Sequence, residues 1–184
     1  MPITAQHVSD TVAAYLADHP DEKDALSTLG EVIEQAGDTI TSRREFRGHV
    51  TAGAALVRPD GRVLTIEHRA LRKWLLPGGH VEDSDTALQG AALRELAEET
   101  GIGSDQVEPV SDVPLHIDVH SIPANDTKGE PEHLHFDFRF LFRTTADTVE
   151  LQEEEVTDYT WQFADMLTTE PLRSRVMAAA AGRP

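Results

Sequence analysis

The stretch from Gly78 to Ile102 reads GGHVEDSDTALQGAALRELAEETGI, and it decides the fold that the sequence predicts. Two glycines follow a proline at its start, which favours a loop over Pro77-Gly78-Gly79. The second half has the pattern of a helix, predicted from about Asp85 to Thr100. Gly101 is well placed to end this helix as a left-handed cap.

Three glutamates share one side of this predicted helix. A helix advances about 100° per residue, so Glu95, Glu98 and Glu99 fall within one third of its circumference. An exposed pair of like charges costs about 0.2–0.5 kcal/mol, so the helix alone gains nothing from this arrangement. A hard divalent cation such as Mg²⁺ removes the repulsion and keeps coordination positions for water and phosphate. A solvated acidic face is the alternative, but the preceding glycines, which let backbone carbonyls approach a metal, favour a metal site.

The segment as a whole resembles the Nudix box, G-x5-E-x7-R-E-U-x-E-E-x-G-U, in which U is a bulky aliphatic residue. Gly79 matches the opening glycine. The second half of the box is matched at every required position, by Arg94, Glu95, Leu96, Glu98, Glu99, Gly101 and Ile102. The resemblance implies a hydrolase that cleaves a diphosphate bond in a nucleoside diphosphate linked to another moiety, or in a similar small substrate.

The resemblance also implies roles for individual residues. Glu95, Glu98 and Glu99 would bind the catalytic Mg²⁺, or Mn²⁺ in its place, with the Gly79 carbonyl as a further ligand. Family members often use a glutamate ahead of the last strand as a metal ligand or base. Glu155 is the preferred candidate here, with a solvated acidic loop as the simpler alternative. Glu98, Glu99 or Glu155 would accept the proton of the attacking water.

The first half of the box departs from the family pattern. Asp85 stands where the family has its first glutamate, and fourteen rather than thirteen residues separate Gly79 from Arg94. If the extra residue is absorbed before the helix, the phase of the three metal glutamates stays unchanged. The support of Arg94 then comes from Asp85, with its shorter reach, or from Glu82 in the loop.

Further segments extend the resemblance to one bacterial Nudix subgroup, from about Ser42 to Leu167. They are HVTAGAALV, HRALRKWLLPGGHVE, HIDVH and HLHFDFRFLF. The implied fold is α/β, with a mixed β-sheet sandwiched between helices. We expect residues 46–184 to form the Nudix domain and residues 1–45, helical by pattern and divided at Pro20, to form an N-terminal extension.

Strands and the last helix are expected from local patterns. Alternating or β-prone runs predict strands, and a proline interrupts the last helical run. The predicted strands are His49–Val57, Arg62–His68, Trp74–Leu76, Val113–Ile122, His133–Arg143 and Asp158–Phe163, and the helix is Ala164–Ala181, interrupted near Pro171.

Two predicted strands each carry a row of polar side chains on one face. The rows are His116, Asp118 and His120 on the first strand, and His133, His135, Asp137 and Arg139 on the second. Phenylalanines and other apolar residues alternate with them and supply the buried face. Three interpretations stay open: a wet face with paired histidines, a substrate pocket, or a separate His/Asp site for zinc or manganese. His49 and His80 are interpreted as structural.

Three cations lie between the second predicted strand and the glycine loop. Arg69, Arg72 and Lys73 could meet substrate phosphate there, although ordinary surface charge explains them equally well. Together with the two polar rows, they complete the set of candidate substrate-binding residues.

The composition limits the partners and the compartment. A formal charge of −17 over 184 residues disfavours nucleic-acid polymers and anionic membranes, but a small phosphorylated substrate can bind where divalent cations invert the local field. The sequence has no cysteine and no long apolar run, so a cytoplasmic protein is expected, and a homodimer is compatible with it. A noncatalytic ligand sensor on the same fold is the alternative function.

Overall fold

The computed structural model describes residues 1–146, 148–151 and 156–181. The helices are α1 (Ala5–Asp18), α2 (Ser27–Ala36), α3 (Leu88–Thr100) and α4 (Leu172–Ala181), with 3-10 turns η1 (Pro20–Glu22), η2 (Gly37–Thr41), η3 (Ser104–Gln106) and η4 (Ala164–Met166). The strands are β1 (His49–Val57), β2 (Arg62–His68), β3 (Lys73–Leu75), β4 (Gly78–His80), β5 (Val107–Pro109), β6 (His116–Ile122), β7 (His133–Thr144) and β8 (Val156–Phe163). None of the helices in these described ranges has the length and apolar character needed to cross a membrane.

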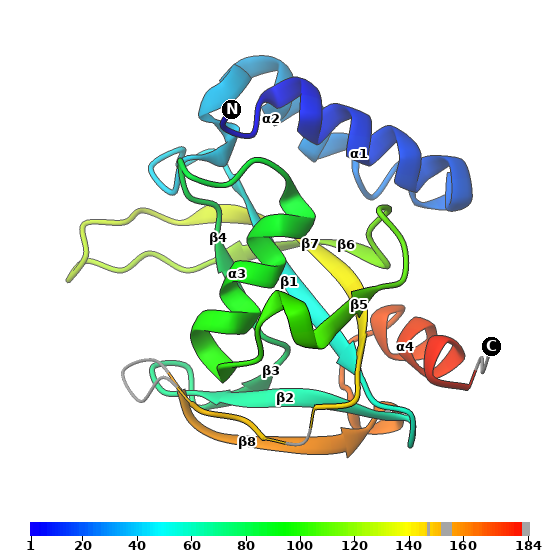
Figure 1. Cartoon of the computed structure of the whole chain (residues 1–184). Coiled ribbons are helices and arrows are strands. Elements are labelled where there is room, and N and C mark those ends of the chain that lie inside the picture. The colour runs from blue at the N-terminus through cyan, green and yellow to red at the C-terminus, as the bar shows by residue number, and fades with distance from the viewer. Residues whose placement is uncertain (147, 152–155, 182–184) are drawn as a thin grey trace.

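The strands form one mixed sheet of eight, centred on β1 and β7. These two strands are parallel and pair along the whole of β1, from His49 opposite His135 to Val57 opposite Arg143. The other pairs are antiparallel. β2 pairs with β1 only beside the turn that joins the two strands, where Val57 lies opposite Val63. β4 pairs with the same edge of β1 nearer its start, at Thr51 to Gly53. The expected mixed sheet between helices is therefore confirmed (Figure 1).

Several details differ from the sequence-based expectations. The strand predicted from Val113 begins at His116, because the chain still bends at Val113 and Leu115. Pro77-Gly78-Gly79 was expected to be loop, but Gly78 to His80 form β4, because the glycines fit closely beside Gly53 on β1. α3 begins at Leu88 rather than at Asp85, whose carboxylate is used within the preceding turn. The short strand β5 was not expected, since its three residues show no alternation.

The two faces of β1 pack against different helices. Val50, Ala52 and Ala54 belong to the larger hydrophobic cluster, which includes Leu88 and Leu96 of α3. Ala55 and Val57 point to the opposite face and pack with residues of η4 and α4. The half of that second face nearest the start of β1 carries His49 and Thr51 instead of apolar residues. Polar side chains therefore gather where α4 does not cover the sheet.

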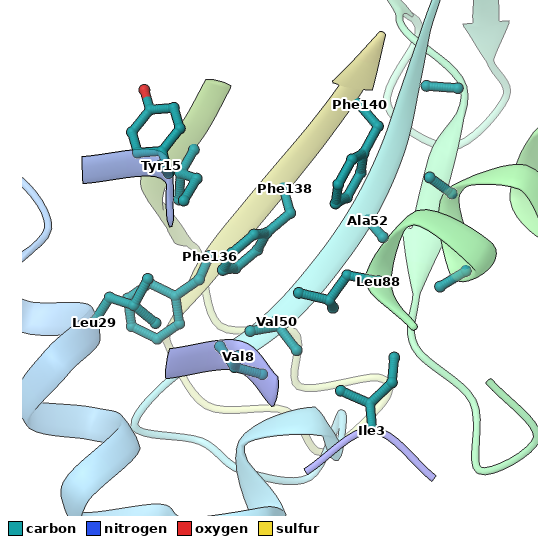
Figure 2. Packing of buried hydrophobic residues seen from close by; sticks show 14 of the residues in the cluster. Ile3, Val8, Tyr15, Leu29, Val50, Ala52, Leu88, Phe136, Phe138 and Phe140 are labelled. Carbon is teal, nitrogen blue, oxygen red and sulfur yellow. The ribbon is translucent and has the colours of Figure 1, made fainter. Parts of the chain in front are cut away.

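The N-terminal helices contribute to the same core as α3. Val8 of α1 and Leu29 of α2 are fully buried in the larger cluster with Val50 and Phe136 (Figure 2). α1 and η1 are also joined to α4, because Arg175 bonds both Tyr15 and Glu22. We propose that residues 1–45 form an extension that shares the core of the domain over residues 46–184.

Candidate functional site

The glutamates of α3 lie against the glycines of β4. Glu99 is buried, and its Oε2 accepts a hydrogen bond of 2.9 Å from the Gly78 amide. Glu95 fills the space that a side chain at position 79 would take, because a Cβ built on Gly79 would lie 2.6 Å from Glu95 Oε2. Because the two glycines have no side chains, the carboxylates of Glu95 and Glu99 can lie against the backbone of β4.

Arg94 holds two of these carboxylates together. Its Nη1 lies 3.0 Å from Glu95 Oε1 and 3.0 Å from Glu98 Oε2. Its Nη2 donates to the His80 carbonyl at 2.8 Å, which fastens α3 to the end of β4. Burial opposes the charge on Arg94, but hydrogen bonds to Asp85 and Glu95 and their charges outweigh it and raise the pKa of the guanidinium.

Of the two residues that the sequence offered as partners of Arg94, Asp85 makes the closer contacts. It accepts two hydrogen bonds from Arg94, of 3.1 Å to Nε and 3.0 Å to Nη2, and one of 2.8 Å from the Glu82 amide. The Glu82 carboxylate is further away, 4.0 Å from Arg94 Nε. α3 runs uninterrupted from Leu88 to Thr100 and carries all three glutamates, so the extra residue of the box does not break the helix.

The donor set fits a divalent cation. Three carboxylates lie on one helix beside backbone glycines, and oxygen donors of this kind suit Mg²⁺ and Mn²⁺. A cationic nitrogen already lies between Glu95 and Glu98, so the two carboxylates are held near a shared positive charge. Glu98 is also accessible, with 48% of its side chain exposed. The residues therefore match the group that the box implies, and the ligand roles of Glu95, Glu98, Glu99 and Gly79 stay predictions.

A cleft of about 370 Å³ opens beside the end of α3. It is lined by Arg69, Val149, Leu151, Val156, Thr157 and Tyr159. The segment entering the cleft packs on α3, since the Glu150 amide donates to the Thr100 carbonyl at 2.8 Å. Arg69 lines this cleft, whereas Arg72, in the same turn, and Lys73, the first residue of β3, are exposed. A role for these three cations in binding substrate phosphate stays a prediction. Glu155 lies outside the described residues.

As expected, the polar rows of β6 and β7 lie on one face of the sheet. Histidines of β1 and β4 lie beside them on that face. The register places Asp118 beside Asp137 and His120 beside His135. On the other side of β7, His49 lies beside His135, and His80 pairs with Thr51. His49 and His80, interpreted from the sequence as structural, therefore join the histidines of β7.

The rings form a continuous cluster around His135. Ring centroids lie 4.6 Å from His135 to His49, 5.2 Å to His133, 5.3 Å to His80 and 5.7 Å to His120. Burial, reinforced by the neighbouring imidazoles, lowers the pKa of His135 to about 2 and that of His80 to about 4. These rings are therefore neutral at pH 7.

Other members of the two rows are already bonded within the protein. Arg139 pairs with Asp137 and donates to the carbonyls of Leu76 and Pro77 at 3.4 and 3.3 Å. His116 is buried, and its Nδ1 lies 3.0 Å from Arg175. Arg139 thus braces the backbone ahead of β4, and His116 joins the contact between α1 and α4. A substrate role for either residue stays a prediction.

His120 and Asp118 are the more accessible members of the rows. His120 Nδ1 lies 2.8 Å from Asp118 Oδ2, with 41% and 37% of the two side chains exposed. The hydrogen bond to Asp118 raises the pKa of His120, and the same bond lowers the pKa of Asp118. A role for this accessible pair in binding substrate stays a prediction.

Comparison with known proteins identifies the family of the chain. The NUDIX domain family model matches residues 47–180. A probable DHNTP pyrophosphohydrolase of Lactococcus lactis is 38% identical, over 61% of this chain and 68% of the relative. An RNA pyrophosphohydrolase of Dinoroseobacter shibae is 41% identical, over 59% of this chain and 72% of the relative.

Solved structures show the same fold. A NUDIX family hydrolase from Clostridium perfringens superposes with a TM-score of 0.54 at 21% identity, covering 72% of this chain and 95% of the other. A C. elegans Ap4A hydrolase superposes with a TM-score of 0.50 at 18% identity, covering 71% of this chain and 96% of the other. With the carboxylate helix, its glycine strand and the matched domain in agreement, the chain belongs to the Nudix family and is a pyrophosphohydrolase acting on phosphorus-containing anhydrides.

Proposed function

We propose that the protein hydrolyses a diphosphate bond in a nucleoside diphosphate linked to another moiety, or in a similar small substrate, and that the reaction depends on Mg²⁺. The observation that carries this proposal is the arrangement of Glu95 and Glu99 against Gly79 and Gly78, with Arg94 bridging Glu95 and Glu98. A solvated acidic face would not bury Glu99 or tie it to a backbone amide.

The three glutamates would hold the divalent ions, with Mn²⁺ as a substitute for Mg²⁺ and the Gly79 carbonyl as an additional donor. Such ions supply Lewis acidity that neutralises phosphate oxygens. Glu98 is the exposed carboxylate of the three and is our first choice to accept the proton of the attacking water, with Glu99 and Glu155 as alternatives. Arg69 at the cleft would meet substrate phosphate, assisted by Arg72 of the same turn and by Lys73 at the start of β3.

The names of the relatives suggest which substrates to test first. One relative is called a DHNTP pyrophosphohydrolase and another an RNA pyrophosphohydrolase. The formal charge of −17 opposes the approach of a long polyanion, so we favour a small phosphorylated substrate over RNA. The same charge argues against binding to an anionic membrane.

The test is a hydrolysis panel run with and without Mg²⁺. It includes dihydroneopterin triphosphate, several nucleoside diphosphates linked to a second moiety, and a 5′-triphosphate RNA. We expect turnover of a small compound that stops when the metal is chelated, and ¹⁸O-labelled water identifies the attacked phosphorus. Binding of these compounds without turnover in Mg²⁺ would favour the noncatalytic sensor instead.

Glu98→Gln tests the chemistry directly. The amide cannot accept a proton, so kcat should fall by at least ~10²-fold, the usual contribution of a general base. Glu31→Gln changes an exposed helical glutamate on α2 and is the matched control. Full activity of Glu98→Gln in Mg²⁺ would contradict the proposed mechanism.

A further inference from the structure

Three histidines on the polar face come close enough to share one ion. One ring nitrogen from each of His49, His133 and His135 lies within 4.8 Å of the other two. They come from the first residues of two neighbouring parallel strands, because the register of β1 and β7 sets His49 beside His135. The group belongs to the face of the sheet opposite α3 and its carboxylates.

The tautomers of two of these rings point a lone pair away from the backbone. His133 Nδ1 lies 2.8 Å from the Pro131 carbonyl, and His49 Nδ1 lies 3.3 Å from the Glu45 carbonyl. A carbonyl only accepts, so Nδ1 carries a proton in both rings, and Nε2 is the nitrogen left to bind a metal. Histidines that ligate metals are typically held in this way by a carbonyl or carboxylate on the other nitrogen.

His49 supplies a second, independent observation that points to a ligand. Its side chain is almost completely buried, at 1% exposure, and within the described part of the chain its Nε2 has no hydrogen-bond partner. A buried acceptor without a partner costs about 1–3 kcal/mol. A cation at the centre of the three rings would satisfy this atom.

We propose that His49, His133 and His135 bind one transition-metal ion of the zinc class, separately from the Mg²⁺ carboxylates of α3. Three imidazole nitrogens match the ligands of zinc and disfavour Mg²⁺, which prefers oxygen. Two nitrogens on a tetrahedral zinc ion are about 3.3 Å apart for Zn–N bonds of 2.0–2.1 Å. The distances between the ligand nitrogens therefore shorten by at most about 1.5 Å on binding. The fourth coordination position of the ion stays open for water or a ligand group.

The site is connected to the carboxylate helix through His80. The His80 ring lies 5.2 Å from that of His49, while its carbonyl accepts from Arg94. An ion that fixes His49 would therefore also limit the movement of β4, where Gly78 and Gly79 meet Glu99 and Glu95. The inference goes beyond the proposed hydrolysis and does not depend on it.

The test measures metal binding rather than turnover. The full chain, prepared without a histidine tag and stripped with a chelator, is titrated with Zn²⁺ by calorimetry in excess Mg²⁺, which keeps the carboxylate site loaded. We expect one equivalent to bind with micromolar affinity or better. Co²⁺ in place of Zn²⁺ should give the intense visible absorption of a near-tetrahedral site.

Variants identify the ligands. His133→Gln and His135→Gln should each weaken Zn²⁺ binding by more than the about 10–100-fold that loss of an outer partner costs. His68→Gln, a half-buried histidine outside the cluster, should bind like the parent chain, and so should Glu98→Gln. Circular dichroism verifies that each variant is folded.

Three results would overturn the assignment. They are a folded parent chain that takes up no Zn²⁺ at micromolar concentration, binding that survives both histidine changes, and binding that disappears in Glu98→Gln. If a histidine variant does not fold, the Co²⁺ spectrum of the parent chain decides, because octahedral oxygen ligation absorbs only weakly. Loss of hydrolysis with Zn²⁺ binding intact would count against the proposed function alone.

Discussion

Replacing Asp85 by alanine tests whether this residue supports Arg94 in place of the usual glutamate. The change removes the two carboxylate contacts of Arg94, at 3.1 and 3.0 Å, and leaves the Glu82 amide without its acceptor at 2.8 Å. Asp85 is 8% exposed, so water does not readily replace these bonds. Arg94 keeps its contacts with Glu95, Glu98 and the His80 carbonyl.

The expected loss of stability follows from these contacts. A hydrogen bond to a charged group contributes about 1.5–3 kcal/mol, but the three bonds are not additive and Arg94 retains other partners. We therefore expect the free energy of unfolding to fall by about 2–4 kcal/mol. At roughly 2–4 °C per kcal/mol for a chain of this size, Tm should fall by about 4–16 °C.

The assay is thermal and urea unfolding of Asp85→Ala, Arg94→Ala and the double variant. Asp83→Ala, an exposed neighbour in the same turn, is the control and should change Tm little. The double-mutant cycle should give a coupling energy of at least about 1 kcal/mol between the two residues. A Tm shift no larger than that of Asp83→Ala, together with a coupling near zero, would refute the assigned role of Asp85.

Two further predictions concern the carboxylates and the polar face. Gly79→Ala places a methyl group 2.6 Å from the end of the flexible Glu95 side chain. We therefore expect kcat to fall at least ~10-fold, while the free energy of unfolding falls by less than about 1.5 kcal/mol. Gly90→Ala is the control, because its methyl group meets nothing within 4 Å, and it should keep full activity in the same assay. For the ion pair of His120 and Asp118, the raised pKa of His120 means that its stabilisation is present below the unfolded pKa and is lost as pH rises through the higher folded pKa. Asp118→Asn should lower the pKa of His120 in an NMR titration, and an unchanged value would show that the bond is absent in solution.

The periodicity of single segments predicted much of the fold. The alternation in β7 placed Phe136 and Phe138 in the core and His135 and Asp137 on the other face, because each strand reverses side-chain direction at every residue. The position of Gly101 correctly predicted the end of α3 in a left-handed cap. As expected, α3 is continuous from Leu88 to Thr100, so Glu95, Glu98 and Glu99 keep their spacing on one helix.

Long-range pairing decided what the patterns left open. Pro77-Gly78-Gly79 has the composition of a loop, and only the free edge of β1 beside Gly53 makes Gly78 to His80 a strand. The sequence left Asp85 and Glu82 as alternative partners of Arg94. The fold of the turn before α3 sets the Asp85 carboxylate within hydrogen-bond distance of Arg94.

The sequence by itself determined the family, the carboxylate helix and the polar face of each strand, because these follow from local spacing along the chain. The histidine group was decided only by tertiary structure. His49 is separated from His133 by most of the domain, and nothing in either segment fixes the parallel register that sets it beside His135. Contacts between distant segments depend on which strand edges meet, and that depends on the packing of the whole core.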